Sequence, residues 1–171
     1  TVPRFTHLAL VFGPDHAPLS KRHGTTSVRE FREGGVLSEA LVNYLALLGW
    51  SPGGGDELLP LDELARRFAI VGVGSSPGVF DPEKLAWVNR HYLKLADPGR
   101  LAAASVGYFT ARGFASAPNE HGRAYLAELL PMAVGSVDRL EEISGDVSGC
   151  STVFAGRRFI CRQQLGGAPN G

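Results

Sequence analysis

A long helical region with its own start and stop signals restricts the possible folds of this chain most strongly. Across residues 27–143, apolar side chains recur every three or four positions, a spacing that places them on one face of an α-helix. Helix starts, marked by a capping side chain or by a carboxylate before proline, occur at Ser27, Ser38, Asp81-Pro82 and Asp97-Pro98. The expected helices cover residues 27–33, 38–48, 61–68, 82–95, 98–113, 120–130 and 137–143. We therefore predict a mainly α fold.

The two ends of the chain have different patterns. The apolar residues 5–12 have high β-propensity and are followed by Gly13-Pro14-Asp15, which predicts one buried N-terminal strand. Beyond the helices, frequent glycines interrupt every periodic pattern, so residues 145–171 are expected to form a divergent or disordered tail. The only cysteines, Cys150 and Cys161, lack the spacing of a zinc site or a disulfide framework.

Charge and hydropathy exclude several classes of protein. The 171 residues include 17 Lys and Arg against 17 Asp and Glu, so the overall basic excess of a dedicated nucleic-acid binder is missing. Any RNA site must then be a local patch. No apolar run approaches the roughly 20 residues that span a bilayer, and the first residues lack the apolar segment of a signal peptide. We expect a cytoplasmic location and no membrane contact.

The loop between the expected strand and the first helix carries the densest chemistry. It places Ser20, Lys21, Arg22 and His23 side by side, ahead of a helix N-terminus, which is a suitable environment for an anion. A flexible lysine can follow phosphate oxygens as charge shifts during phosphoryl or nucleotidyl transfer, while a serine hydroxyl adds a directional hydrogen bond. The loop therefore indicates a polyphosphate ligand. Three adjacent basic residues can equally be a solvated turn.

The surrounding sequence decides between these interpretations. Residues 5–48 and 76–89, which include the string Ser76-Pro77-Gly78-Val79-Phe80-Asp81-Pro82, closely resemble bacterial glutamyl-tRNA synthetases, which are class I aminoacyl-tRNA synthetases. In that family residues 19–22 match the second signature of the class, the lysine-methionine-serine-lysine-serine loop. The signature loop here consists of Pro18, Leu19, Ser20, Lys21 and Arg22, with Pro18 standing where the first lysine of the motif usually lies.

The resemblance implies roles for individual residues. Lys21 matches the lysine that contacts the ATP phosphates and stabilises the transition state of glutamate adenylation, and Ser20 and Arg22 match the flanking ATP-binding positions. It implies ATP with Mg²⁺ as a substrate complex, L-glutamate and tRNA(Glu) as further substrates, and a monomeric parent enzyme. Neither a tightly bound cofactor nor a metal site is expected in this segment.

The resemblance also implies a division of the chain. Residues 1–25 are expected to be the last strand and signature loop of the catalytic domain, 26–96 a helical stem-contact region, 97–144 the start of a helical anticodon-binding domain, and 145–171 the tail. The first signature of the class and the glutamate-binding residues have no counterpart here. We therefore expect this segment alone to be inactive.

Contacts with tRNA need basic side chains on helical faces. The candidates are Arg29, Arg32, Arg66, Arg67, Arg90 and Lys94, although exposed helices carry solvated charges in any case. Trp50, Phe80 and Trp87 could stack on bases, but their positions in apolar periodic segments favour the core.

Two other functions remain open from the sequence. The chain could be a non-catalytic helical module that binds tRNA. It could also come from a glutamyl-queuosine tRNA(Asp) synthetase, although that enzyme lacks an anticodon-binding region and the helices expected after Asp97 argue against it.

Overall fold

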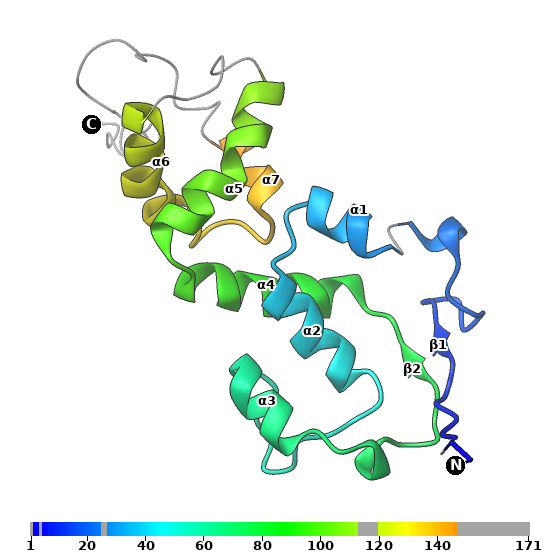
Figure 1. The fold of residues 1–171 in the computed structure, drawn as a ribbon. Helices are drawn as coiled ribbons and strands as arrows, with labels where there is room; N and C mark the ends of the chain where they lie inside the picture. The colour runs from blue at the N-terminus through cyan, green and yellow to red at the C-terminus, as the bar shows by residue number, and fades with distance from the viewer. Residues whose placement is uncertain (1, 4, 25–26, 113–119, 147–171) are drawn as a thin grey trace, which may run out of the picture. The chain divides into compact units, whose positions relative to one another are not determined.

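The computed structural model describes residues 2–3, 5–24, 27–112 and 120–146. The chain forms two compact units, Thr1–Leu95 and Ala96–Gly171. In chain order the helices and strands are β1 (Val11–Phe12), α1 (Val28–Glu33), α2 (Ser38–Leu47), α3 (Leu61–Arg67), β2 (Gly78–Val79), α4 (Pro82–Leu95), α5 (Pro98–Ala111), α6 (Glu120–Ala133) and α7 (Leu140–Asp146) (Figure 1). Short 3-10 turns are present at Lys21–His23 and Ile70–Gly72. The predicted mainly α fold is confirmed.

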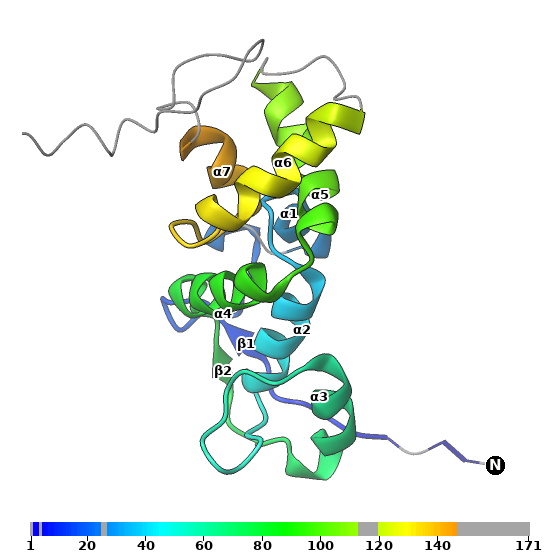
Figure 2. The ribbon, with the colours of Figure 1, turned by 90° about the vertical axis from the view of Figure 1, so that its left-hand side faces the viewer.

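The first unit is built on the packing of α2 against α4 (Figures 1 and 2). Leu85 and Val88 of α4 and Tyr44 of α2 are almost fully buried, and burying each such side chain contributes about 2 kcal/mol. Phe80 lies between two rings, with centroid distances of 5.9 Å to Phe31 and 5.6 Å to Tyr44. This aromatic contact connects α1 and α2 to the chain just before α4.

The predicted helix starts depend on side-chain caps, and most are present. Ser27 and Glu30 form a capping box, with N–O distances of 3.2 and 3.0 Å. Asp81 accepts the N–H groups of Glu83 and Lys84 at the start of α4, and the side chain of Asp97 caps α5.

The start of α2 differs from the prediction. Ser38 is its first residue, and its hydroxyl contacts the Glu39 carboxylate at 2.9 Å instead of capping the helix. The N–H of Leu37, the residue before α2, donates to Oδ1 of Asn89 at 2.8 Å. The start of α2 is therefore fixed by a buried amide from α4, which lies 52 residues further along the chain.

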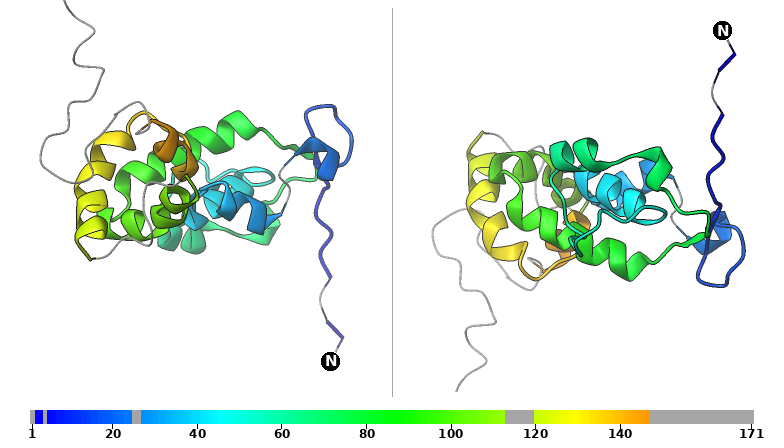
Figure 3. Two further views of the ribbon diagram at one scale, coloured as in Figure 1. Left: turned by 90° about the horizontal axis from the view of Figure 1, so that it is seen from above. Right: turned by 90° about the horizontal axis from the view of Figure 1, so that it is seen from below.

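The N-terminal strand is shorter than expected. Only Val11–Phe12 is extended in a sheet, paired in parallel with Gly78–Val79, whereas Leu8 and Leu10 are more than 60% exposed. Within the described residues, no strand lies beside residues 5–10, so their backbone has no ladder to join. Leu8 and Ala9 instead line a cavity with side chains of α2 and α3, and Figure 3 shows the N-terminal end of the chain leading away from the helices of the first unit.

The second unit packs α5 against α6 and α7. The helix predicted to end before Pro131 continues to Ala133. The N–H of Val134 bonds to the carbonyl of Leu130 at 2.9 Å, and both side chains are buried, so packing on either side keeps the backbone helical across the proline. The predicted tail lies outside the described residues from position 147 onward.

Candidate functional site

The loop between β1 and α1 folds back on the end of β1. The N–H of Leu19 donates to the carbonyl of Val11 at 2.9 Å, and the N–H of Gly13 donates to the carbonyl of Ala17 at 2.8 Å. Pro18 forms an antiparallel bridge with Phe12. Pro18, at the first position of the signature loop, is therefore part of the paired backbone. The motif loses the charge of its usual lysine here, but the geometry of the turn is intact.

Lys21 opens the 3-10 turn that follows. Its side chain is exposed and has no polar or charged partner within the described part of the chain. Arg22, the next residue, is also exposed, but its guanidinium lies 3.6 Å from the Asp15 carboxylate. Of these two adjacent cations, Lys21 is therefore the one whose whole charge is available to a ligand.

His23 differs from the prediction of an anion-facing side chain. Its side chain is only 8% exposed, and Nε2 lies 2.9 Å from Oδ1 of Asp15. Nδ1 is 3.0 Å from the backbone N–H of Ser20 and 3.4 Å from the Ser20 hydroxyl. The sequence places three basic residues in a row, but the fold turns the third inward.

Asp15 also belongs to this loop, although from the sequence alone it is only part of the turn that ends the strand. Its Oδ1 accepts the N–H of Ala17 at 3.0 Å, as an aspartate at the start of a turn commonly does. That backbone bond, followed by the contact with His23, lowers the pKa of Asp15 below its usual value. The carboxylate thus stays charged beside Arg22 and His23.

The predicted tRNA contacts occupy three separate helices of the first unit. Arg29 and Arg32 lie on α1, Arg66 and Arg67 on α3, and Arg90 and Lys94 on α4. Helices α1 and α3 lie at opposite ends of α2 (Figures 1 and 2). The structure therefore does not gather these side chains into one cluster.

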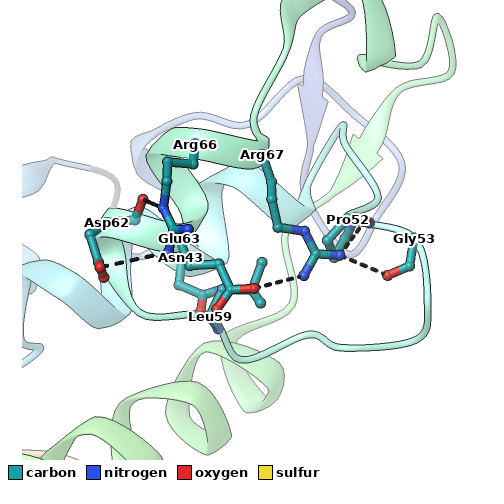
Figure 4. Close-up of polar contacts among 8 residues, drawn as sticks. All are labelled: Asn43, Pro52, Gly53, Leu59, Asp62, Glu63, Arg66 and Arg67. Atoms are coloured by element: carbon teal, nitrogen blue, oxygen red, sulfur yellow. Dashed lines mark hydrogen bonds and ion pairs between the residues drawn. The ribbon is translucent and has the colours of Figure 1, made fainter.

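Arg66 and Arg67 have different environments although they are neighbours (Figure 4). Arg67 donates to the carbonyl groups of Pro52 and Gly53 at 2.5 and 3.1 Å, and to the Glu63 carboxylate at 3.2 Å. The Arg66 side chain is 73% exposed, and among the described residues its polar contacts stay within its own helix, with Asp62. Arg67 therefore has a structural role, whereas Arg66 faces solvent.

The remaining candidates differ in their exposure and in their partners. Arg29 is bound to Glu33 at 2.8 Å, which raises the pKa of the arginine. Arg32 is exposed, Arg90 is half-buried, and Lys94 is exposed without a partner in the described part of the chain.

The aromatic candidates are not all in the core. Trp50 and Phe80 are buried, as predicted, but Trp87 is 45% exposed on α4. The expectation that Trp87 belongs to the core is therefore wrong, because helical spacing places it on the face opposite to the buried residues of α4, such as Leu85 and Val88.

An apolar cavity of about 410 Å³ lies elsewhere in the first unit. It is lined by side chains that include Leu8, Val42, Leu45, Phe68 and Val73, and no titratable residue faces it. None of the signature-loop residues, 18–22, borders it. Within the described residues, no three His, Cys, Asp or Glu side chains come together as metal ligands, and no helix is long and apolar enough to cross a bilayer.

The family is decided by the match of residues 1–87 to the catalytic domain of class I tRNA synthetases for glutamate and glutamine, described as "tRNA synthetases class I (E and Q), catalytic domain". The chain belongs to this family. The match includes β1, the signature loop and most of the first unit.

Individual relatives agree with this assignment. The glutamate–tRNA ligase of Natranaerobius thermophilus is 47% identical over 142 residues, which cover 82% of this chain and 29% of that protein. The glutamate–tRNA ligase of Pelobacter propionicus is 52% identical over 112 residues, covering 66% and 24%. The chain thus spans less than a third of the length of these relatives.

Solved structures share the fold. The glutamate–tRNA synthetase of Elizabethkingia anophelis matches with a TM-score of 0.71 at 24% identity, over 86% of this chain and 32% of that one. A glutamate–tRNA ligase from Elizabethkingia meningosepticum, solved with its amino acid, matches with a TM-score of 0.68 over the same shares.

Proposed function

We propose that this chain is the segment of a glutamate–tRNA ligase that supplies the phosphate-binding loop and the tRNA stem contacts. The complete enzyme would activate L-glutamate with ATP, taken as its Mg²⁺ complex, and transfer it to tRNA(Glu). The observation that carries this proposal is the charge of Lys21, whose exposed side chain has no polar or charged partner in the described residues. Lys21 lies in the second signature motif of a family whose catalytic domain matches this part of the chain.

The proposed chemistry follows from where charge develops. When the glutamate carboxylate attacks the α-phosphorus of ATP, negative charge accumulates on the leaving pyrophosphate. A lysine without an internal partner can approach that charge, and such electrostatic stabilisation in the transition state is worth about two to three orders of magnitude in rate. Arg22 shares its charge with Asp15, so its contribution is expected to be smaller.

The stem-contact role rests on exposed cations of the first unit. Lys94 and Arg66 are the strongest candidates, because one has no partner in the described residues and the other reaches only its own helix. The second unit would then be the beginning of the anticodon-binding domain, starting at the Asp97 cap of α5.

The test uses an intact enzyme. Residues 1–144 replace the aligned segment of the Natranaerobius thermophilus glutamate–tRNA ligase, and glutamate-dependent exchange of pyrophosphate into ATP is measured with saturating tRNA(Glu). We expect the chimaera to be active and Lys21→Ala to lower the exchange rate by about 100-fold or more, since a transition-state partner is lost. The charge-matched control is Lys84→Ala, which removes a cation paired with Glu57 at 2.6 Å on α4.

Two outcomes would contradict the proposal. Exchange by Lys21→Ala at the rate of the unmutated chimaera would remove Lys21 from catalysis. An inactive chimaera that still binds tRNA(Glu) would favour the non-catalytic tRNA-binding module instead.

A further inference from the structure

We propose that His23 is a positioning residue that holds residues 13–23 in the shape from which Lys21 projects into solvent. The inference rests on the proposed function, in which Lys21 meets the ATP phosphates. The His23 ring connects the two ends of the loop. It contacts Gly13 and Asp15 near the start and the backbone of Ser20 near the end.

The contact with Ser20 determines the chemical form of the ring. A backbone N–H can only donate, so Nδ1 must accept the bond of 3.0 Å through its lone pair. In the neutral ring the proton then resides on Nε2. Ser20 is the residue before the turn Lys21–His23, so this bond fixes the backbone on which Lys21 begins.

The contact with Asp15 anchors the other side of the ring. Nε2 is buried and lies 2.9 Å from the carboxylate oxygen Oδ1, although this oxygen is not aligned for a hydrogen bond with Nε2. The attraction is therefore mainly electrostatic. Because the same Asp15 oxygen accepts the N–H of Ala17, the carboxylate itself is held in place by the first half of the loop.

Close packing at Gly13 completes the arrangement. A Cβ atom at this glycine would lie 2.8 to 3.0 Å from three atoms of the His23 ring, which is closer than carbon atoms approach without displacement. The ring is thus seated directly on the backbone that leaves β1. Side-chain exposure of 8% excludes it from the anion-facing surface, which leaves Lys21 and Arg22 there.

The positioning role can be measured in the 171-residue chain without reference to catalysis. A long-range ¹H–¹⁵N correlation spectrum of the histidine rings reports the tautomer, and we expect His23 to carry its proton on Nε2 at neutral pH. In His23→Phe the ring volume is kept but the acceptor is lost, so hydrogen exchange of the Ser20 amide should accelerate by about tenfold. In His23→Asn the side-chain carbonyl replaces Nδ1 as an acceptor, and exchange should remain within about threefold of the original.

The same two variants test the connection to Lys21 in the chimaera. His23→Phe should lower the pyrophosphate-exchange kcat by about tenfold or more, since small displacements of a reacting group have effects of this size. The KM for tRNA(Glu) should not change, and His23→Asn should restore most of the rate. In the Lys21→Ala background, His23→Phe should have no further effect, because non-additivity identifies residues that act through one another.

Several results would overturn the inference. They are a proton on Nδ1, Ser20 exchange that does not respond to His23→Phe, or a rate loss that His23→Asn shares equally. A rate loss that adds fully to that of Lys21→Ala would likewise show that His23 does not act through Lys21. If the tautomer and exchange results hold but the chimaera is inactive, the structural role of His23 stands and the proposed function is what fails.

Discussion

The loop at residues 13–23 and the pair of helices α2 and α4 are held together in opposite ways. In the loop, side-chain contacts such as that between Ser20 and His23 join residues only a few positions apart, and most of these side chains are exposed. Between α2 and α4, buried amides connect residues about 50 positions apart. The first region is held by local contacts and carries an exposed lysine, Lys21, without a partner in the described residues, whereas the second is held by distant contacts between buried groups.

This difference separates function from stability. A local, exposed contact contributes little to the free energy of unfolding. Solvent screens it, and a short loop restricts the entropy of the unfolded chain only slightly. A buried amide between distant segments contributes more, since its loss leaves polar groups without partners in the core. Substitutions in the loop should therefore change chemistry, and substitutions at the helix pair should change stability.

The largest expected loss of stability is at Asn89. Its Oδ1 accepts the N–H of Leu37 and its Nδ2 donates to the carbonyl of Gly35, and the residue is fully buried. Asn89→Ala leaves both backbone groups without this partner, which should lower the free energy of unfolding by about 3 kcal/mol. Urea unfolding followed by tryptophan fluorescence measures this change, because both tryptophans, Trp50 and Trp87, lie in the first unit.

Ser38→Ala is the matched control for this prediction. The sequence favours Ser38 as the cap of α2, but within the described residues its hydroxyl donates to the exposed Glu39 carboxylate instead. Its removal should change the free energy of unfolding by less than about 0.5 kcal/mol. A loss of about 1 kcal/mol or more at Ser38, with little change at Asn89, would show that α2 is capped locally and would remove the contrast with the loop.

The two helix starts at Ser27 and Ser38 show what the sequence can predict about the fold. The capping box at Ser27 uses residues three apart, so the pattern of types alone identifies it. The cap of α2 comes from Asn89, and no local pattern indicates which of many asparagines will meet a helix start 52 residues away. Local signals predicted most helix boundaries, and distant packing decided the others, including the passage of α6 through Pro131.

The candidate site divides in the same manner. The order of residue types around Lys21 predicts the signature loop and its cation. The inward turn of His23 depends on the absence of a side chain at Gly13 and on the position of Asp15, which spacing alone does not reveal. The pattern of basic residues also does not distinguish Arg66 from Arg67. Their environments differ because Arg67 donates to the carbonyl groups of Pro52 and Gly53, which only the fold brings close to it.

Gly13→Ala tests whether the His23 ring packs directly on the backbone of the loop. The added methyl group would overlap the His23 ring, so we expect a loss of about 1 kcal/mol in the free energy of unfolding together with faster hydrogen exchange at Ser20. In a His23→Ala background the same substitution should cost nothing further, since the overlapping atoms are gone. An equal cost in both backgrounds would mean that the glycine is needed for another reason.

Arg67 gives the most discriminating test, because it combines features of both regions. Like the loop cations it is charged and partly exposed, but like the buried amides it reaches distant backbone, at Pro52 and Gly53. Arg67→Met keeps most of the apolar stem and removes three hydrogen bonds, so a loss of about 1 kcal/mol is expected. Arg66→Met, one residue earlier on α3, should cost less than about 0.5 kcal/mol, because its contacts with Asp62 are exposed. If urea unfolding gives the same value for both variants, then neither the distant partners of Arg67 nor its lower exposure adds to stability here.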